Sequence, residues 1–271
     1  MHNSEKIKNM VKEKYADIAV KAEKSCCCSK STHQSSLSNK DDEFSLLTKD
    51  YDGMDGYFPD ADLNLGCGVP TKYAGIHEGD TVVDLGSGAG NDVFIARRIV
   101  GEKGRVIGID MTTEMINIAN QNKAKLDYDN VEFRLGEIEN LPLNDNTTDV
   151  IISNCVLNLV PDKHKAFREI YRCLKSGGHF CVSDIVLNGK ISDDLKEIAV
   201  IYAGCISGAV DEKEYLDIIN KTGFINIEIK QRIEAKIPDE LLLQYVSEDK
   251  LNEIHNEVKG IYSITVVGYK K

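Results

Sequence analysis

From about residue 80 onward, short apolar runs alternate with segments in which apolar residues recur at helical spacing. This alternation is typical of parallel strands joined by crossover helices. We expect strands at Thr81–Leu85, Arg105–Ile109, Val131–Leu135, Asp149–Ser153 and Phe180–Ser183. We expect helices at Asn91–Val100, Met115–Ala124 and Ala166–Leu174, the last ended by Gly177-Gly178. The order predicts an α/β fold with a doubly wound, Rossmann-like sheet.

Two further segments flank this sheet. Glu5–Lys24 carries a partial apolar stripe that predicts a helix, and the polar run that follows, to about Glu43, cannot bury much surface. The tail has helical patterns at Leu195–Ala203 and Lys213–Thr222 and alternating runs at Ile225–Ile233 and Tyr262–Val267. We therefore predict an N-terminal helix with a mobile cysteine-containing segment at 1–50, a cofactor-binding domain at 51–187 and a smaller C-terminal α+β unit at 188–271.

Composition narrows the class of protein. The 271 residues are 42% hydrophobic and 28% charged, as in soluble globular proteins. A net charge of -11 argues against nucleic acid as a partner, because phosphate binding needs clustered Lys and Arg. No apolar run is long enough for a membrane span, so we expect a cytoplasmic protein. Its eight cysteines are then expected to be thiols rather than disulfides.

The first expected strand runs into a glycine-rich loop, Asp84-Leu85-Gly86-Ser87-Gly88-Ala89-Gly90. Glycines let backbone N–H groups approach a ligand closely at the switch point of the sheet, so Gly86, Ser87 and Gly88 are predicted to bind a cofactor. The spacing differs from the G-x-G-x-x-G of dinucleotide sites, and Asp84 would repel a diphosphate. A nicotinamide dehydrogenase is therefore the least favoured interpretation.

Acidic residues stand at the ends of three successive strands. Asp84 suits the ammonium of a cofactor that carries an amino acid, and Asp110 can accept both ribose hydroxyl hydrogens. Glu137 is placed to accept the adenine amino group, although a solvated strand-end acid is an equally good interpretation of Glu137 alone. The three acids together fit S-adenosylmethionine better than a dinucleotide. The predicted cofactor site also includes Met111, Ile138 and Asn154.

Three cysteines fall where a ligand would bind. Cys67 lies between two glycines, Cys155 directly follows the fourth strand, and Cys205 lies in a small-residue stretch of the C-terminal unit. Thiolates are soft ligands, so cysteines gathered beside a methyl donor favour a thiophilic atom. Each of the three alone fits plain burial as well, and burial is the favoured interpretation of Cys173 and Cys181.

Zinc is a weaker interpretation of these cysteines. Structural zinc sites usually show C-x2-C or histidine partners at fixed spacing, and the sequence has neither. The triplet Cys26-Cys27-Cys28 fits a surface metal-binding tract as well as a source of reactive thiols.

Several motifs resemble the arsenite S-adenosylmethionine methyltransferase family. They are Gly66-Cys67-Gly68, Gly108 to Thr112, Ser153 to Lys163, Gly204 to Ala209 and Ser263 to Tyr269. The third motif is highly specific, and the resemblance runs from about Gly66 to the C-terminus. Leu65 departs from the pattern, because some members carry a tyrosine there, near the sulfonium.

The resemblance implies transfer of a methyl group from S-adenosylmethionine to trivalent arsenic, as arsenite or its thiol conjugates, for detoxification. It implies that Cys155 and Cys205 bind the arsenic. Cys67, a further arsenic ligand, and an N-terminal cysteine would act in early steps and disulfide exchange. Any member of the triplet Cys26-Cys27-Cys28 can match the N-terminal position, and we use Cys27 as its representative. Glutathione or a thioredoxin-like protein would serve as the thiol reductant. A methyltransferase for a small organic acceptor and a metalloid-binding protein without turnover remain as alternatives.

Overall fold

The structure is a computed structural model that describes residues 2–26, 51, 53–189, 208–235, 243 and 247–271. The described residues form a seven-stranded sheet in the order β3-β2-β1-β4-β5-β7-β6. The strands are β1 (Thr81–Leu85), β2 (Arg105–Asp110), β3 (Val131–Leu135), β4 (Thr148–Asn154), β5 (Leu174–Gly189), β6 (Ile225–Ala235) and β7 (Val258–Tyr269). Neighbouring strands from β3 to β5 are parallel, and β7 is antiparallel to both β5 and β6. This arrangement confirms the predicted Rossmann-like α/β fold.

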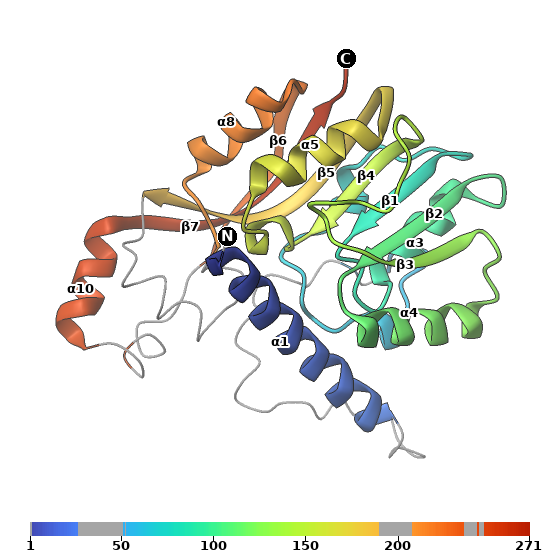
Figure 1. Cartoon of the computed structure of the whole chain (residues 1–271), viewed down its shortest axis with the longest axis horizontal. Coiled ribbons are helices and arrows are strands. Elements are labelled where there is room, and N and C mark those ends of the chain that lie inside the picture. Colours follow the sequence, from blue (N-terminus) through green and yellow to red (C-terminus); the bar gives the residue numbers. More distant parts are fainter. Residues whose placement is uncertain (1, 27–50, 52, 190–207, 236–242, 244–246) are drawn as a thin grey trace.

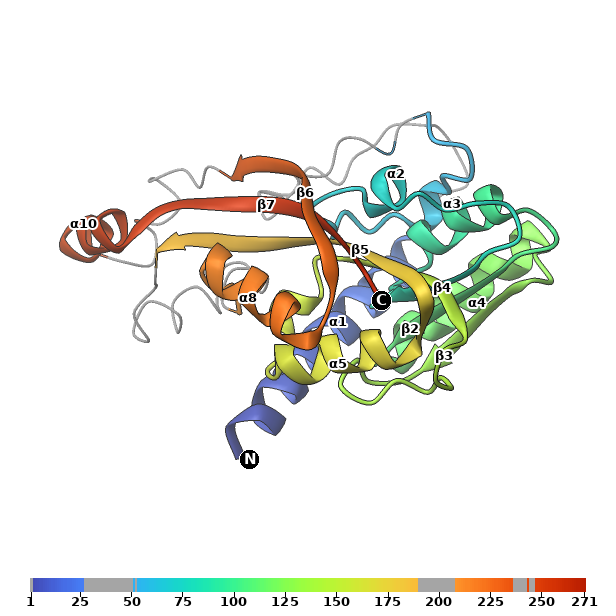
Figure 2. The same ribbon diagram turned by 90° about the horizontal axis from the view of Figure 1, so that it is seen from above.

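Helices cover both faces of this sheet. They are α1 (His2–Cys26), α2 (Pro70–Tyr73), α3 (Asn91–Val100), α4 (Thr113–Leu126), α5 (Lys163–Cys173), α8 (Glu212–Thr222) and α10 (Glu248–Glu257). Two 3-10 turns are η2 (Pro59–Ala61) and η3 (Leu157–Leu159). Figures 1 and 2 show α5 and α8 side by side against the sheet, with α10 at the far end of the long strands β5 and β7.

The central strands are buried on both faces. In β1, Val83 belongs to a hydrophobic cluster with Phe167 of α5, whereas Val82 belongs to a second cluster with Phe94 of α3 and Met115 of α4. Successive side chains of a strand point to opposite faces, so a strand covered on both sides must be apolar at almost every position. This explains why β1 reads as an apolar run rather than an alternating one.

The helix before β5 ends earlier than the sequence predicts. α5 ends at Cys173, and Leu174 already pairs with Thr148 of β4. The pair Gly177-Gly178 lies inside the irregular first part of β5, where both glycines exchange backbone hydrogen bonds with Lys270. The predicted helix end at this glycine pair was therefore wrong, because pairing with β4 and with the C-terminal residues extends the strand backward.

The C-terminal strands join the main sheet. β7 pairs with β5 and β6 pairs with β7, and α8 confirms the helix predicted at Lys213–Thr222. α10 was not predicted. The helix expected at Leu195–Ala203 lies outside the described residues, and the domain boundaries at 50/51 and 187/188 stay predictions.

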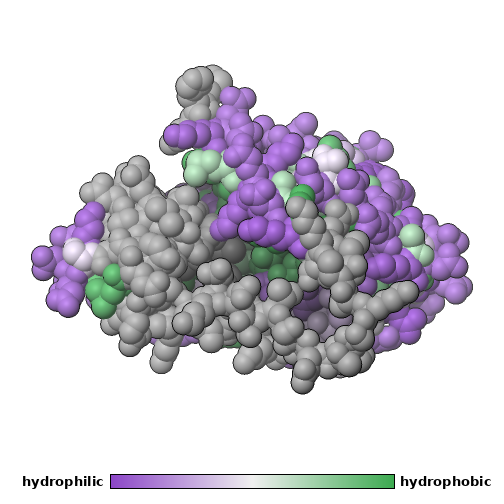
Figure 3. All heavy atoms as spheres, turned by 90° about the horizontal axis from the view of Figure 1, so that it is seen from below, coloured by the Kyte–Doolittle hydropathy of each residue, from purple (hydrophilic) through white to green (hydrophobic). Residues whose placement is uncertain are grey.

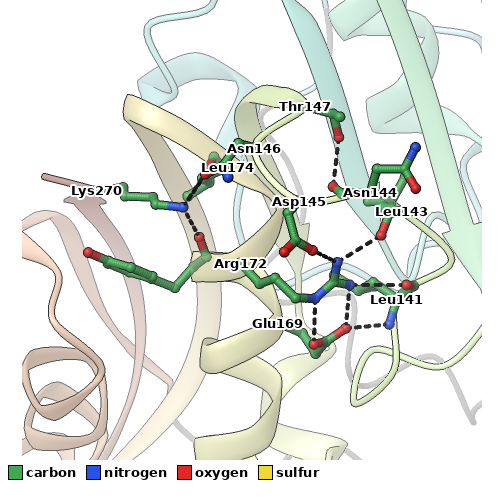
Figure 4. A network of polar contacts seen from close by, with 11 residues as sticks. Leu141, Leu143, Asn144, Asp145, Asn146, Thr147, Glu169, Arg172, Leu174 and Lys270 are labelled. Atoms are coloured by element: carbon green, nitrogen blue, oxygen red, sulfur yellow. Dashed lines mark hydrogen bonds and ion pairs between the residues drawn. The ribbon is translucent and has the colours of Figure 1, made fainter.

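A polar network fastens the loop between β3 and β4 to α5 (Figure 4). The Arg172 guanidinium donates to the carbonyl oxygens of Leu141 and Leu143, and it pairs with Asp145 and Glu169. Glu169 in turn accepts the Leu141 N–H at 2.9 Å. Hydrogen bonding to Arg172 lowers the pKa of Glu169, which keeps this acceptor ionised. The loop is thus held by charge-assisted hydrogen bonds at several points.

Among the helices that the structure describes, none combines the length and apolar character needed to cross a membrane.

Candidate active site

The candidate site lies at the carboxyl ends of β1, β2 and β4, where the strand order changes direction. Ligands of open α/β sheets bind at this switch point. A cavity that is partly open to solvent is found there. It is lined by every residue predicted to bind the cofactor and by Cys155: Asp84, Gly86, Ser87, Gly88, Asp110, Met111, Glu137, Ile138 and Asn154. Figure 3 shows hydrophobic surface recessed beside hydrophilic side chains on the face of the molecule that is seen from below.

The glycine loop has the geometry of a backbone cradle. Gly86 has a φ of +68°, in the left-handed region, and a Cβ at this position would collide with Val156. The N–H groups of Gly86 and Ser87 both donate to the Ile109 carbonyl, at 2.7 and 3.0 Å, which anchors the loop on β2. Gly88 donates its N–H to Asp110 Oδ2 at 3.0 Å. The loop and the end of β2 therefore form one unit.

Two buried carboxylates, Asp84 and Asp92, and the half-buried Asp110 lie at this edge of the sheet. Burial, and then the charges of Asp92 and Asp110, raise the pKa of Asp84 well above its ordinary value. Burial likewise raises the pKa of Asp92, to about 6, although Tyr51, Asn154 and other donors oppose the rise. Burial also raises the pKa of Asp110. Buried like charges are costly unless a cation or hydrogen-bond donor compensates them.

The cavity has the donor and acceptor groups that S-adenosylmethionine requires. Its acids match a ligand that carries an ammonium, a sulfonium, ribose hydroxyls and an amino group. The buried side-chain oxygens Ser87 Oγ and Asn91 Oδ1 line the cavity and have no hydrogen-bond partner among the described residues. Most buried polar atoms in native proteins have a hydrogen-bond partner, so we expect a ligand or water to bond to these two oxygens. The residues present therefore fit this cofactor.

Helix α1 forms part of the cavity wall through Lys8, Val11 and Tyr15. The Lys8 ammonium lies 2.8 Å from Glu137 Oε2 and also forms an ion pair with the largely buried Glu139. Burial lowers the pKa of Lys8, but hydrogen bonds to the two glutamates outweigh this and raise it. Glu137, predicted to accept the adenine amino group, thus already shares its carboxylate with a lysine.

Asn154 holds the loop that contains Cys67. Its side-chain oxygen accepts the N–H groups of Cys67 and Gly68 at 3.0 and 3.2 Å, and its amide nitrogen donates to the Gly68 carbonyl at 2.8 Å. On the other side, Ser263 Oγ donates to the Cys67 carbonyl at 2.5 Å. A Cβ at Gly68 would stand 2.6 Å from Ser183 Oγ, so this close approach requires glycine.

The Asn154 amide is held in turn by Tyr51 and Asp92. Its nitrogen donates to the Tyr51 hydroxyl at 2.7 Å, and that hydroxyl donates to Asp92 Oδ2 at 2.6 Å. Thr71 Oγ1 adds a contact to Asp92 at 3.4 Å. The network joins the start of α3, the end of β4 and the Cys67 loop, so the cofactor loop and this cysteine are mechanically connected.

Cys155 adopts a backbone conformation that is uncommon for a residue with a side chain. Its φ is +60°, in the left-handed region, and its N–H donates to the Ser183 carbonyl at 2.7 Å. Such conformations persist where surrounding contacts enforce them, and they concentrate at functional sites. The turn places a buried cysteine in the cavity wall immediately after Asn154.

A buried polar group lies behind the two cysteines. The Tyr215 hydroxyl donates to Asp184 Oδ2 at 2.7 Å. Burial raises the pKa of Tyr215 well above its ordinary value, and Asp184, Cys67 and Cys155 add to the rise. Burial raises the pKa of Asp184 to about 7.

The structure brings Cys67 and Cys155 into one neighbourhood, but it does not bring every predicted residue together. Cys67 is buried and does not line the cavity, although Leu65 and Gly66 do. Cys205 and Cys27 lie outside the described residues, so their roles stay predictions. Within the described ranges no cluster of three or more His, Cys, Asp or Glu side chains is suited to a metal ion.

Two further cysteines, Cys173 and Cys181, are buried in the core. Cys173 lies in one hydrophobic cluster and Cys181 in the other. Burial raises the pKa of both thiols, that of Cys173 to about 11. Neither lines the cavity. This is the packing environment predicted for them.

Sequence reasoning missed Tyr51, Asp92 and Lys8. Asp92 directly follows the glycine loop at the start of a helix, and that position was a usable signal. Tyr51 and Lys8 carry no comparable local signal, because their partners are 41 and 129 residues away.

Comparisons with known proteins agree with this geometry. A family model described as "Methyltransferase domain" matches residues 76–223. The chain is 40% identical over 243 residues to an arsenite methyltransferase of Halobacterium salinarum, covering 85% of this chain and 60% of that protein. It is 39% identical over 173 residues to an arsenite methyltransferase of Rattus norvegicus, covering 59% of this chain and 45% of that protein. The chain therefore spans less than two thirds of the length of these relatives.

A solved structure is similar as well. The arsenic(III) S-adenosylmethionine methyltransferase of Chlamydomonas reinhardtii superposes with a TM-score of 0.63 at 35% identity. The match covers 73% of this chain and 65% of that one.

Proposed function

The chain belongs to the methyltransferase domain family, and from that premise we propose that it transfers a methyl group from S-adenosylmethionine to trivalent arsenic bound by cysteine thiolates. The names of its relatives and of the Chlamydomonas structure support arsenic as the acceptor. A cytoplasmic location, where thiols stay reduced, is part of the proposal.

One observation carries the proposal. Asn154, in the wall of the cofactor cavity, binds the backbone of Cys67 and directly precedes Cys155. A single residue therefore ties a methyl-donor site to two cysteines that are distant in sequence. Cysteines that served only as packing would not need this connection to the cofactor cavity.

The cofactor is predicted to be held by groups from three strand ends. The acids would bind its cationic and hydroxyl groups, and the glycines of the loop would let the cofactor approach the backbone closely. S-adenosylmethionine supplies an electrophilic methyl group and is released as S-adenosylhomocysteine.

The proposed role of Cys155 and Cys205 is to replace the oxygen ligands of arsenite and to orient the arsenic. Thiolate-bound trivalent arsenic keeps a lone pair, so the arsenic itself is the nucleophile and no side chain has to remove a proton from it. Orientation of two reactants can supply roughly 7 to 11 kcal/mol of barrier reduction.

Electrons must balance over the cycle. Methylation formally oxidises arsenic from the trivalent to the pentavalent state. Two thiols that form one disulfide return the two electrons, and glutathione or a thioredoxin-like dithiol would reduce that disulfide. Cys67 and Cys27 are the proposed internal thiols.

The test is an assay with arsenite, a thiol and methyl-labelled S-adenosylmethionine, with the arsenic species identified by mass spectrometry. We expect labelled methylarsenic and no cofactor consumption without arsenite. Cofactor consumption with an organic acceptor alone, or arsenite binding without consumption, would contradict the proposal and support one of the two alternatives.

Cys155→Ser is expected to lower arsenic methylation by about 100-fold or more, because serine cannot act as a soft ligand. Its affinity for S-adenosylhomocysteine should stay within about twofold of the parent. Cys173→Ser is the matched control, since this buried cysteine does not line the cavity, and it should remain active. Retained activity in Cys155→Ser would rule out the thiolate site.

A further inference from the structure

Helix α1 lies outside the segment that the family model matches, residues 76–223, yet it borders the cofactor cavity. The helix is docked rather than detached. Ala19 is fully buried, and Tyr15 and Ile18 pack against the hydrophobic cluster that contains Met115 of α4. Figure 1 shows α1 running below the sheet and ending close to α4. The position of Lys8 is therefore set by packing several turns further along the helix.

Lys8 bridges two acids of the loop after β3. Its ammonium lies 2.8 Å from Glu137 Oε2 and forms an ion pair with Glu139. The Glu139 side chain is only 6% exposed, and its Oε1 also accepts the Asp162 N–H at 3.1 Å. An exposed ion pair alone contributes little, but this lysine is anchored by a buried carboxylate.

Glu137 differs from Glu139 in exposure. Its side chain is 56% exposed, and the bond to Lys8 is the one hydrogen bond to its side chain that we identify within the described ranges. Lys8 binds Oε2 and leaves Oε1 available as an acceptor. An exposed glutamate otherwise loses rotamer freedom when it binds a ligand, and a neighbour that already holds it lowers this entropic cost.

We propose that Lys8 is a positioning residue that orients Glu137 to accept the amino group of the cofactor's adenine, so that α1 takes part in base recognition. This inference rests on the proposed function, because it presupposes S-adenosylmethionine as the ligand. It assigns a binding role to a helix that lies outside the residues matched by the family model.

The experiment measures binding of two ligands by calorimetry. S-adenosylhomocysteine carries the adenine amino group, and S-inosylhomocysteine carries a carbonyl oxygen in its place. Lys8→Met should weaken binding of S-adenosylhomocysteine by about tenfold and binding of S-inosylhomocysteine by less than about twofold, since only the first ligand carries the amino group that Glu137 is proposed to accept. Lys8→Arg keeps the charge and should recover most of the affinity.

Lys12→Met is the matched control, because Lys12 is exposed one helical turn further along α1 and does not line the cavity. It should leave both affinities unchanged. In a Glu137→Gln background, Lys8→Met should have little further effect, as expected for coupled residues.

If Lys8→Met weakened binding of both ligands equally, the inference would be overturned, because Lys8 would then serve only to dock the helix. So would identical behaviour of the Lys8 and Lys12 variants. If the parent chain bound neither ligand, the proposed function would fail first, whereas tight parent binding with an ineffective Lys8→Met would reject the role of Lys8 alone.

Discussion

At the scale of single residues, the site depends on side chains that use nearly all of their hydrogen-bonding groups. The Asn154 amide contacts the Cys67 loop with its oxygen and Tyr51 with its nitrogen. Tyr51 then donates to the buried carboxylate of Asp92. Removing one member of such a network leaves its buried partners unsatisfied, which costs more than the missing bond alone.

Tyr51→Phe is predicted to lower the free energy of unfolding by about 1 to 3 kcal/mol, because it removes a donor from Asp92 and an acceptor from Asn154. Arsenic methylation should fall as well, since the Cys67 loop loses part of its support. Urea denaturation and the labelled-methyl assay measure the two effects.

Tyr57→Phe is the control for this variant. The Tyr57 ring stacks on that of Tyr51, but its hydroxyl bonds to Asp62 at the part-buried edge of the segment. Tyr57→Phe should lower the free energy of unfolding by less than about 1 kcal/mol. Equal losses in both variants would contradict a special role for the Tyr51 hydroxyl.

At the scale of elements, two features decide how the site is framed. The α5 helix fastens the loop between β3 and β4 through Arg172. The long strand β5 carries Ser183, which accepts the Cys155 N–H and lies against Gly68. Both elements support the cavity without binding the cofactor. Substitutions in them are therefore expected to lower activity indirectly, by reducing the stability of the fold and the order of the loops.

Arg172→Met is predicted to destabilise the chain by about 2 kcal/mol, because the Leu141 and Leu143 carbonyls and two acids lose a charged donor. Amide hydrogen exchange should also speed up across residues 141–147. Arg168→Met, which changes an exposed arginine of the same helix, is the reference. If both variants had the same exchange rates in this loop, the fastening role would be wrong.

At the scale of the whole molecule, the buried acids make stability depend on pH. Burial raises the pKa of Asp184 to about 7 and that of Asp92 to about 6, above the ordinary value of 3.8. The folded chain therefore holds protons that the unfolded chain releases between about pH 4 and pH 7. Stability from these two groups increases as the pH falls through this window and is lost as it rises.

Without cofactor, the free energy of unfolding is predicted to be about 2 to 3 kcal/mol higher at pH 5.5 than at pH 7.5 from these two groups. Cofactor affinity should change in the opposite direction, because protonated acids attract a cationic ligand less. Denaturation and calorimetry at both pH values test this pair of trends. Asp184→Asn should remove the larger share of the stability difference between the two pH values and leave the pH dependence of cofactor affinity in place. If the stability of the parent chain did not change between pH 5.5 and pH 7.5, the raised pKa values of Asp184 and Asp92 would be refuted.

Local patterns in the sequence were enough to predict the first five strands and the edge of the sheet at which the cavity lies. Apolar runs, the loop from Asp84 to Gly90 and the acids at strand ends are local signals, and the parallel topology then brings all strand ends to one edge. Cys155 was found for the same reason, because it directly follows a strand. Periodicity and turn chemistry act over a few residues, so such features can be read without coordinates.

Which distant side chains come into contact depends on packing in three dimensions. The contact of Lys8 with Glu137, that of Tyr51 with Asn154 and the pairing that draws Gly177-Gly178 into β5 all join residues brought together by packing. No local sequence pattern encodes these contacts, because they depend on the positions of whole helices and strands in the folded chain. The apolar surface that these elements bury sets those positions, and the polar contacts of the site follow from them.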